Sequence, residues 1–194
     1  MSLANQQLQH ALKEWAIAVD ALTAGKTIVL LRKGGIREAG FKVKHPLVWL
    51  YPTYEHQKPE LLKPEYAPQV VPVPSGWHPQ TVSIKSCAAI TEVLSLNYPS
   101  QLAALQSYHV WNERLVSDRL KWKPQTPLMV LLLRVYCLDS PQIIPYHQLY
   151  GGCKSWIELR EPIETNCLRA AIATQEYEQK VKEIKALVAA KSKI

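Results

Sequence analysis

The segment Leu128-Met129-Val130-Leu131-Leu132-Leu133-Arg134-Val135-Tyr136-Cys137 decides the fold class. Apart from Arg134, residues 129–137 are apolar at odd and even positions alike, which is typical of a strand buried on both faces. Such a strand lies at the centre of a sheet and needs partners along its edges. We therefore expect other parts of the chain to supply further strands around it.

Extended segments precede and follow this central strand. Residues 81–90 alternate between apolar and polar side chains, which predicts a half-buried strand. Shorter extended runs are expected at residues 27–32, 41–44, 47–51 and 155–159. The first run leads directly into the turn Arg32-Lys33-Gly34-Gly35, where glycine permits a positive φ. Residues 27–51 are therefore expected to form a hairpin or meander.

Helices are predicted at the start, in the middle and at the end of the chain. The first should end at Gly25, because apolar residues precede it at alternating spacings of four and three, namely Leu8, Leu12, Trp15, Val19 and Leu22. Pro99 near a helix start predicts a middle helical segment over residues 99–120, with a break near residues 108 and 109. Residues 162–190 are expected to form one long helix.

Strands and helices that do not alternate regularly indicate the α+β class. The expected architecture is a small mixed or barrel-like β-sheet with an N-terminal helix, a middle helical segment and a long C-terminal helix. Residues 1–160 would form a single domain, and residues 161–194 a helix that packs on it or mediates assembly. A proline-rich loop at residues 52–80 holds seven of the fourteen prolines, and loops of this length are often functional or linkers.

The composition indicates a basic globular protein. The 194 residues are 47% hydrophobic and carry a formal net charge of +7, which favours nucleic acid, acidic proteins or anionic membrane surfaces as partners. The four cysteines show no Cys-x-x-Cys spacing, as expected of reduced thiols in a cytosolic protein. With no signal peptide and no apolar run long enough to cross a bilayer, we expect a cytoplasmic protein that does not enter membranes.

Two basic blocks are candidates for phosphate contact. Residues 26–49 contain six cations and one acid, and within them Arg32, Lys33 and Arg37 surround the glycine pair. Solvated cations on a hairpin would give the same pattern, and neither a P-loop nor a Rossmann fingerprint is present. In the second block, Lys121 and Lys123 flank Trp122, which suits stacking on single strands; a core tryptophan with long polar neighbours is the alternative.

Three residues are weak candidates for catalysis, although no catalytic set can be assigned. His56 follows a strand, beside Glu55, at the start of the long loop, where its pKa range suits acid or base chemistry. Cys153 lies between a glycine pair and Lys154 and is a candidate nucleophile. Arg134 is a cation inside an apolar strand, so it needs a partner: an acid such as Glu92 or Glu158, or a bound phosphate. Structural roles are the alternative for all three.

Neither a metal nor a cofactor is expected. The histidines and cysteines lack zinc-ligand spacing, and no Asp/Glu cluster resembles a two-metal nuclease site.

Several blocks of the chain resemble the bacterial family called domain of unknown function 1802. They are Glu14-Trp15-Ala16, Leu30-Leu31-Arg32-Lys33-Gly34-Gly35-Ile36, Tyr51-Pro52-Thr53-Tyr54-Glu55-His56-Gln57, Arg119-Leu120-Lys121-Trp122-Lys123-Pro124, Leu131-Leu132-Leu133-Arg134-Val135-Tyr136 and Tyr150-Gly151-Gly152-Cys153-Lys154-Ser155-Trp156. The resemblance carries no established activity or site residue. It implies a link to DNA processing, because some relatives lie near restriction-endonuclease-like domains.

The sequence therefore favours a nucleic-acid-binding or restriction-associated accessory module without its own catalytic site. Its DNA or RNA partner would contact six residues, Arg32, Lys33, Arg37, Lys121, Trp122 and Lys123. One alternative is a hydrolase-like enzyme in which Tyr51, His56, Arg134 and Cys153 share a pocket. Another is a non-catalytic protein whose C-terminal helix binds a protein partner or a second copy of the chain.

Overall fold

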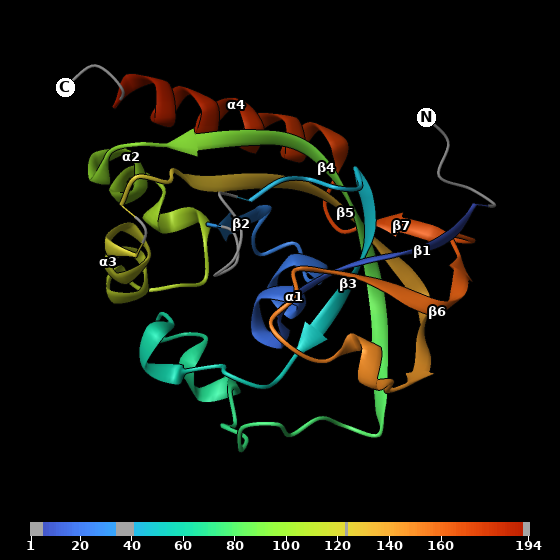
Figure 1. The fold of residues 1–194 in the computed structure, drawn as a ribbon. Helices are drawn as coiled ribbons and strands as arrows, with labels where there is room; N and C mark the ends of the chain where they lie inside the picture. The colour runs from blue at the N-terminus through green and yellow to red at the C-terminus, as the bar shows by residue number, and fades with distance from the viewer. Residues whose placement is uncertain (1–5, 34–40, 123, 192–194) are drawn as a thin grey trace.

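The computed structural model describes residues 6–33, 41–122 and 124–191 and contains one mixed seven-stranded sheet with helices packed on it (Figure 1). The strands are β1 (Gln7–Trp15), β2 (Val29–Arg32), β3 (Leu47–Thr53), β4 (Thr81–Leu96), β5 (Leu128–Pro145), β6 (Trp156–Glu164) and β7 (Leu168–Ala170). The helices are α1 (Ala16–Thr23), α2 (Pro99–Ala104), α3 (Glu113–Lys121) and α4 (Thr174–Ala190). The expected α+β class with a mixed sheet is confirmed.

Strand β5 is the central strand that the apolar run predicts. The sheet order is β2-β5-β4-β3-β1-β6, with β7 also paired to β5. β4 follows one edge of β5 along most of its length, while the other edge is shared between β2 and β7. Both faces of β5 are covered here, and residues 130–133 are 0% exposed.

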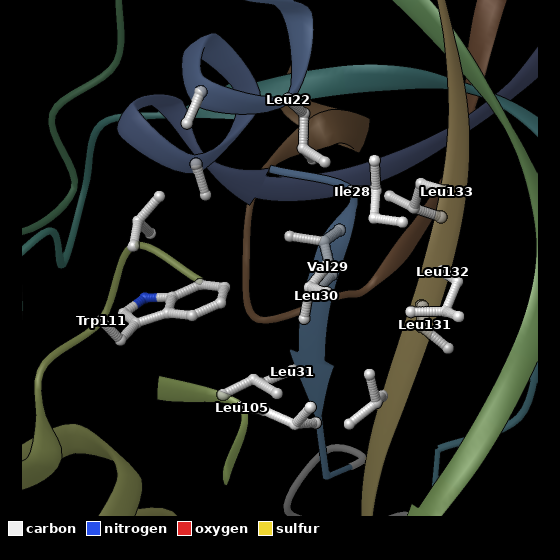
Figure 2. Close-up of a cluster of buried hydrophobic side chains, with 14 of the residues drawn as sticks. Leu22, Ile28, Val29, Leu30, Leu31, Leu105, Trp111, Leu131, Leu132 and Leu133 are labelled. Carbon is white, nitrogen blue, oxygen red and sulfur yellow. The ribbon is translucent and has the colours of Figure 1, made fainter. Parts of the chain in front are cut away.

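The larger core lies between the sheet and the helices. Figure 2 shows Leu131, Leu132 and Leu133 of β5 beside the side chains of β2, with Trp111 and Leu105 from the middle helical segment nearby. Each fully buried leucine stabilises the fold by about 2 kcal/mol relative to an exposed one. A second cluster, which includes Ala11, Trp49, Tyr51 and Ile157, fills the space around β1, β3 and β6.

The predicted N-terminal helix is wrong over its first half. Residues 7–15 form β1, which runs parallel to β3 and antiparallel to β6, and the helix begins only at Ala16. Because β1 lies inside the sheet, Ala11 is buried in one core and Leu12 in the other. A strand that is buried on both faces does not alternate between apolar and polar residues. Its apolar residues therefore showed only spacings of three and four, which are typical of a helix. Gly25, with a φ of 70°, does follow the helix as predicted.

The predicted hairpin over residues 27–51 is also wrong. β2 pairs with β5, whereas β3 pairs with β4 and β1, and residues 41–44 form no strand. The two long strands β4 and β5 offer continuous edges that outcompete local pairing between two short ones. The glycine pair, Gly34 and Gly35, lies outside the described residues.

The C-terminal helix is shorter than predicted, because residues 156–164 and 168–170 form β6 and β7. β6 is the last strand in the order of the sheet, and proline is tolerated in such an edge strand, as at Pro162. α4 lies across β4 and β5 in Figure 1 and buries Tyr177, Ile184 and Val188. Glu176 and Lys180 form an ion pair at 3.0 Å on this helix.

The proline-rich loop and the broken middle helix are confirmed. The loop contains two short 3-10 turns, η1 (Pro59–Leu61) and η2 (Ala67–Gln69), and α2 is separated from α3 by a third, η3 (Gln106–Tyr108). Within the described residues, every helix is too short or too polar to pass through a bilayer.

Candidate functional site

A half-open cleft of about 150 Å³ lies where the two ends of the proline-rich loop meet. Aromatic side chains from four segments line it, and we call it the tyrosine cleft. β3 and the start of the loop supply Tyr51 and Tyr54, and the end of the loop supplies Trp77 and His78. The segment after β5 supplies Tyr146 and Tyr150, and β1 supplies Lys13.

The rings of the tyrosine cleft support one another. Tyr150 makes edge contacts with Tyr51 and Tyr146, at centroid distances of 5.6 and 6.4 Å. His78 stacks on Tyr146 at 3.6 Å, which ties the end of the loop to the segment after β5. Mutual packing of this kind fixes aromatic faces at low entropic cost, so the cleft is preorganised for a flat, apolar ligand.

The hydroxyl of Tyr51 is a buried polar group without a partner. The residue is 3% exposed, and no described residue hydrogen-bonds to its hydroxyl. Leaving a hydroxyl buried and unpaired costs about 1–3 kcal/mol. Burial also raises the pKa of Tyr51, so the group stays a neutral hydroxyl that can both donate and accept. A ligand that meets this hydroxyl with a polar edge recovers that free energy.

Lys13 brings positive charge to the cleft. Its Nζ donates to the carbonyl of Tyr150 at 2.5 Å and to that of Gly152 at 2.8 Å. An ammonium group has three donors, so these two bonds leave capacity for one more. Burial lowers the pKa of Lys13 from its ordinary value. The same side chain therefore holds the glycine turn in place and charges the rim of the cleft.

The structure explains why the turn contains two glycines, Gly151 and Gly152. A Cβ on Gly151 would lie 2.9 Å from the hydroxyl oxygen of Tyr146, and Gly152 has a φ of 74°. A side chain at either position would displace Tyr146 or strain the turn. Both glycines therefore shape the tyrosine cleft.

Glu55 connects the two ends of the proline-rich loop by hydrogen bonds. Its Oε1 accepts hydrogen bonds from the backbone N–H of Gly76 at 2.6 Å and from the hydroxyl of Ser75 at 3.2 Å. The bond from Gly76 is the main reason why the pKa of Glu55 lies below its ordinary value. This carboxylate joins the two ends of the loop and so holds Trp77 beside the cleft.

Arg32 and Lys33, which the sequence predicts as phosphate contacts, are engaged by the protein itself. Arg32 Nη1 donates to Glu14 Oε2 at 3.0 Å, and Nη2 donates to the Lys13 carbonyl at 2.6 Å. Lys33 is 2% exposed and its Nζ donates to two carbonyls in the last turn of α3, at 2.6 and 3.0 Å. Burial lowers the pKa of Lys33. A nucleic-acid contact by these two residues stays a prediction.

Two of the other predicted nucleic-acid contacts, Lys121 and Trp122, lie at the end of α3. Lys121 is exposed there, and Trp122 follows it and lines a second cleft. Arg37 and Lys123 lie outside the described residues. The structure thus places Trp122 beside Arg119 of α3, and neither residue lines the tyrosine cleft.

The three catalytic candidates do not meet. His56 lies in the loop with a φ of 66° and a 59% exposed side chain, its Nε2 3.3 Å from Glu55 Oε1. Cys153 is an exposed free cysteine after the glycine turn. Arg134 lies under α4, where its guanidinium donates to the Ile172 carbonyl at 2.8 Å. The shared pocket that the hydrolase-like alternative requires is therefore absent from the described residues.

The acidic partner predicted for Arg134 is also wrong. Its guanidinium binds backbone and hydroxyl oxygens before and at the start of α4, including Thr174 Oγ1 at 3.0 Å, and lies 5.0 Å from the Tyr177 ring centre. Glu92 pairs with Lys185 instead. Among the described residues, no group of three or more metal-ligating side chains comes together.

Sequence reasoning named Tyr51, Glu55 and the glycine turn, all of which contribute to the tyrosine cleft. It missed Lys13, Trp77, His78 and Tyr146. Lys13 was hidden by the helix prediction, and the others lie in loops whose positions depend on contacts between distant segments. The strand-to-loop junction at residues 51–57, a common location for site residues, did mark one wall of the cleft.

The sequence model of the family described as Domain of unknown function (DUF1802) matches residues 11–183. Among solved structures, the chain is similar to ASCH from Zymomonas mobilis, with 16% identity, a TM-score of 0.47 and coverage of 89% of this chain and 92% of that one. Two ZmASCH mutant proteins match with 14% and 15% identity, TM-scores of 0.46 and 0.44, and coverage of 93% and 89% of this chain and 98% and 95% of theirs. No curated protein matches. Similarity at this level does not extend to function.

Proposed function

This chain belongs to the family of unknown function DUF1802, and we propose that it binds single-stranded nucleic acid by taking one base into the tyrosine cleft. The observation that carries the proposal is the unpaired, buried hydroxyl of Tyr51 in a cleft walled by aromatic rings. The proposal concerns binding alone, in an accessory module without its own catalytic site. An association with restriction systems stays a prediction.

The size and lining of the cleft suit one flat ring. Cavities of about 150 Å³ accept a ligand of the size of benzene, and the tyrosine cleft has this volume with an open side. Bases that are splayed out of a single strand stack on aromatic side chains and present polar edges for hydrogen bonding. The Tyr51 hydroxyl would meet such an edge. A base within a duplex could not enter, because its faces and edges are already occupied.

Charge supports a nucleic acid rather than an uncharged aromatic ligand. The chain carries a formal net charge of +7, and the Lys13 ammonium lies at the cleft beside the glycine turn. A backbone phosphate beside the bound base would find a cation there. Phosphate neutralisation makes affinity fall with salt, with a slope of about 0.7 per contact for single strands.

The test is the affinity of labelled ten-nucleotide single strands for the protein, measured by fluorescence anisotropy at two salt concentrations, with a duplex for comparison. We expect salt-sensitive binding of single strands, and a loss of about tenfold in the Tyr51→Phe variant, because one hydrogen bond is removed. Tyr98→Phe is the matched control, since Tyr98 is 43% exposed and lies outside the cleft.

Thermal unfolding of the same variants separates binding from folding. Removal of an unpaired buried hydroxyl should leave the stability of Tyr51→Phe unchanged or higher. A variant that is fully stable yet binds weakly supports the proposal. Equal affinities for Tyr51→Phe and the unmodified protein, or preference for the duplex, would contradict it.

A further inference from the structure

A second cleft, of about 410 Å³, lies between α3 and the end of β1. Its walls are mostly apolar and include the indoles of Trp15 and Trp122, so we call it the tryptophan cleft. Lys58 and Arg119 bring positive charge to it, and Asp118 brings one negative charge. Two indoles beside two cations form a surface on which a base can stack while its phosphate is neutralised.

Several charged groups lie around Arg119, which lines this cleft. Arg32 and Lys33 are largely buried, Arg119 is partly buried, and Glu14, 8% exposed, is the acid that pairs with Arg32. Asp118 is exposed at the surface of α3. Arg32 donates to Glu14 and a carbonyl, and Lys33 donates to two carbonyls. Of these three cations, Arg119 is therefore the one placed to meet an anion in the cleft.

One donor group in this cluster lacks an acceptor within the described parts of the chain. The Nε of Arg32 is buried without a partner. Burial lowers the pKa of Arg119, as does the neighbouring Arg32, while Glu14 acts in the opposite direction. Arg119 lines the cleft directly, so an anion that enters can reach it.

The two clefts adjoin one another. Lys13 lines the first and Trp15, two positions further along β1, lines the second. In the loop, Glu55 lines the first cleft and His56 lines the second, and their side chains lie 3.3 Å apart. A strand that leaves the tyrosine cleft would reach the tryptophan cleft past the side chains of Glu55 and His56.

We infer that the tryptophan cleft binds the nucleotide next to the one held in the tyrosine cleft, with its base against Trp15 and Trp122 and its phosphate on Arg119. This inference rests on the proposed function. It assigns the length of strand that the protein recognises: at least two consecutive nucleotides, with the connecting phosphate contributing to affinity.

The test compares uridine with the dinucleotide UpU by calorimetry, on the full chain and on two variants of the second cleft. The unmodified protein should bind UpU at least tenfold more tightly than uridine. Arg119→Gln and Trp122→Leu should each lower the affinity for UpU at least fivefold and leave that for uridine unchanged. Arg119→Gln should also reduce the salt slope for UpU by about 0.7. Arg114→Gln, on the exposed side of the same helix, is the matched control.

The outcomes separate this inference from the proposed function. If UpU and uridine bind equally well and Tyr51→Phe weakens both, the tyrosine cleft is supported and the second subsite is overturned. If neither ligand binds at millimolar concentration, the proposed function fails and the subsite fails with it. Thermal unfolding controls for folding, because a variant that unfolds at the same temperature as the unmodified protein yet binds UpU weakly has lost binding alone.

Discussion

Several polar side chains are buried at a cost in folding free energy. Tyr51 and His109 are buried without hydrogen-bond partners among the described residues, and Lys33 is buried against carbonyls rather than an acid. Tyr51 lines a cleft, which gives its unpaired hydroxyl a role in binding. His109 lines none of the clefts described above, and its effect is expected on stability alone.

His109 should make stability depend on pH. It is 2% exposed, and burial, assisted by the charge of Lys63, lowers its pKa to about 4. In the unfolded chain the pKa is about 6.5, so the unfolded state takes up the proton first as the pH falls. The free energy of unfolding should therefore be highest above pH 6.5 and should fall by about 3 kcal/mol between pH 6.5 and 4.

The check is urea denaturation at pH 7 and at pH 4 for the unmodified protein and for His109→Phe. The carboxylates titrate alike in both proteins, so the difference between the two pH dependences isolates His109. A shallower dependence in His109→Phe supports the expectation. Identical dependences in the two proteins would exclude it.

Lys33 should contribute to stability rather than to affinity. Its Nζ donates to the carbonyls of Arg119 and Leu120, which are otherwise left without intrahelical donors at the end of α3. Lys33→Ala should lower the free energy of unfolding by about 1–3 kcal/mol in urea denaturation. The exposed Lys121, at the end of the same helix, supplies the control Lys121→Ala, which should change stability by less than about 0.5 kcal/mol. A stable Lys33→Ala that loses affinity would show that the sequence-based role in phosphate contact was correct.

The strands and helices show which predictions from sequence succeed. β5 was predicted because Met129 and its successors are apolar at odd and even positions alike, and β4 because alternation marks a half-buried strand. β1 was missed for a related reason: burial of both Ala11 and Leu12 removes alternation, and the residual spacing fits a helix. The predicted strand at residues 155–159 ended too early, because Pro162 was interpreted as the start of a helix. In the structure Pro162 belongs to β6, a strand at the edge of the sheet.

Gly25, which follows α1, packs closely against Ile172 in the segment before α4, and this contact gives a prediction. A Cβ there would lie 2.5 Å from Ile172 Cγ2, and φ is 70°. Gly76 has a similar φ of 81°, yet a Cβ there would meet nothing within 4 Å. Gly76→Ala should therefore cost about 1 kcal/mol from backbone strain alone, and Gly25→Ala clearly more.

Chemical denaturation of both variants measures the difference. The double variant Gly25→Ala with Ile172→Ala should recover part of the loss, because the side chain that obstructs the new methyl group has been removed. If Gly25→Ala and Gly76→Ala lower the free energy of unfolding equally, the Ile172 side chain can move aside without a loss of stability, and the prediction is wrong.

The whole molecule explains why the binding site could be predicted only in part. The tyrosine cleft combines β1, both ends of the proline-rich loop and the segment after β5, which are neighbours only because β1, β3 and β6 lie side by side. The sequence drew attention to residues 51–57 and to the glycine turn, and both contribute to the cleft. It could not place Lys13, because that requires the parallel pairing of β1 with β3.

The net charge of +7 and the two adjoining clefts suggest one binding surface that follows a single strand. The measurement that tests this most directly is the crystal structure of the protein in complex with a short oligouridylate. We expect one base within the tyrosine cleft, with a polar atom of its edge within hydrogen-bonding distance of the Tyr51 hydroxyl. An oligonucleotide bound elsewhere, with the tyrosine cleft empty, would rule out the proposed binding mode.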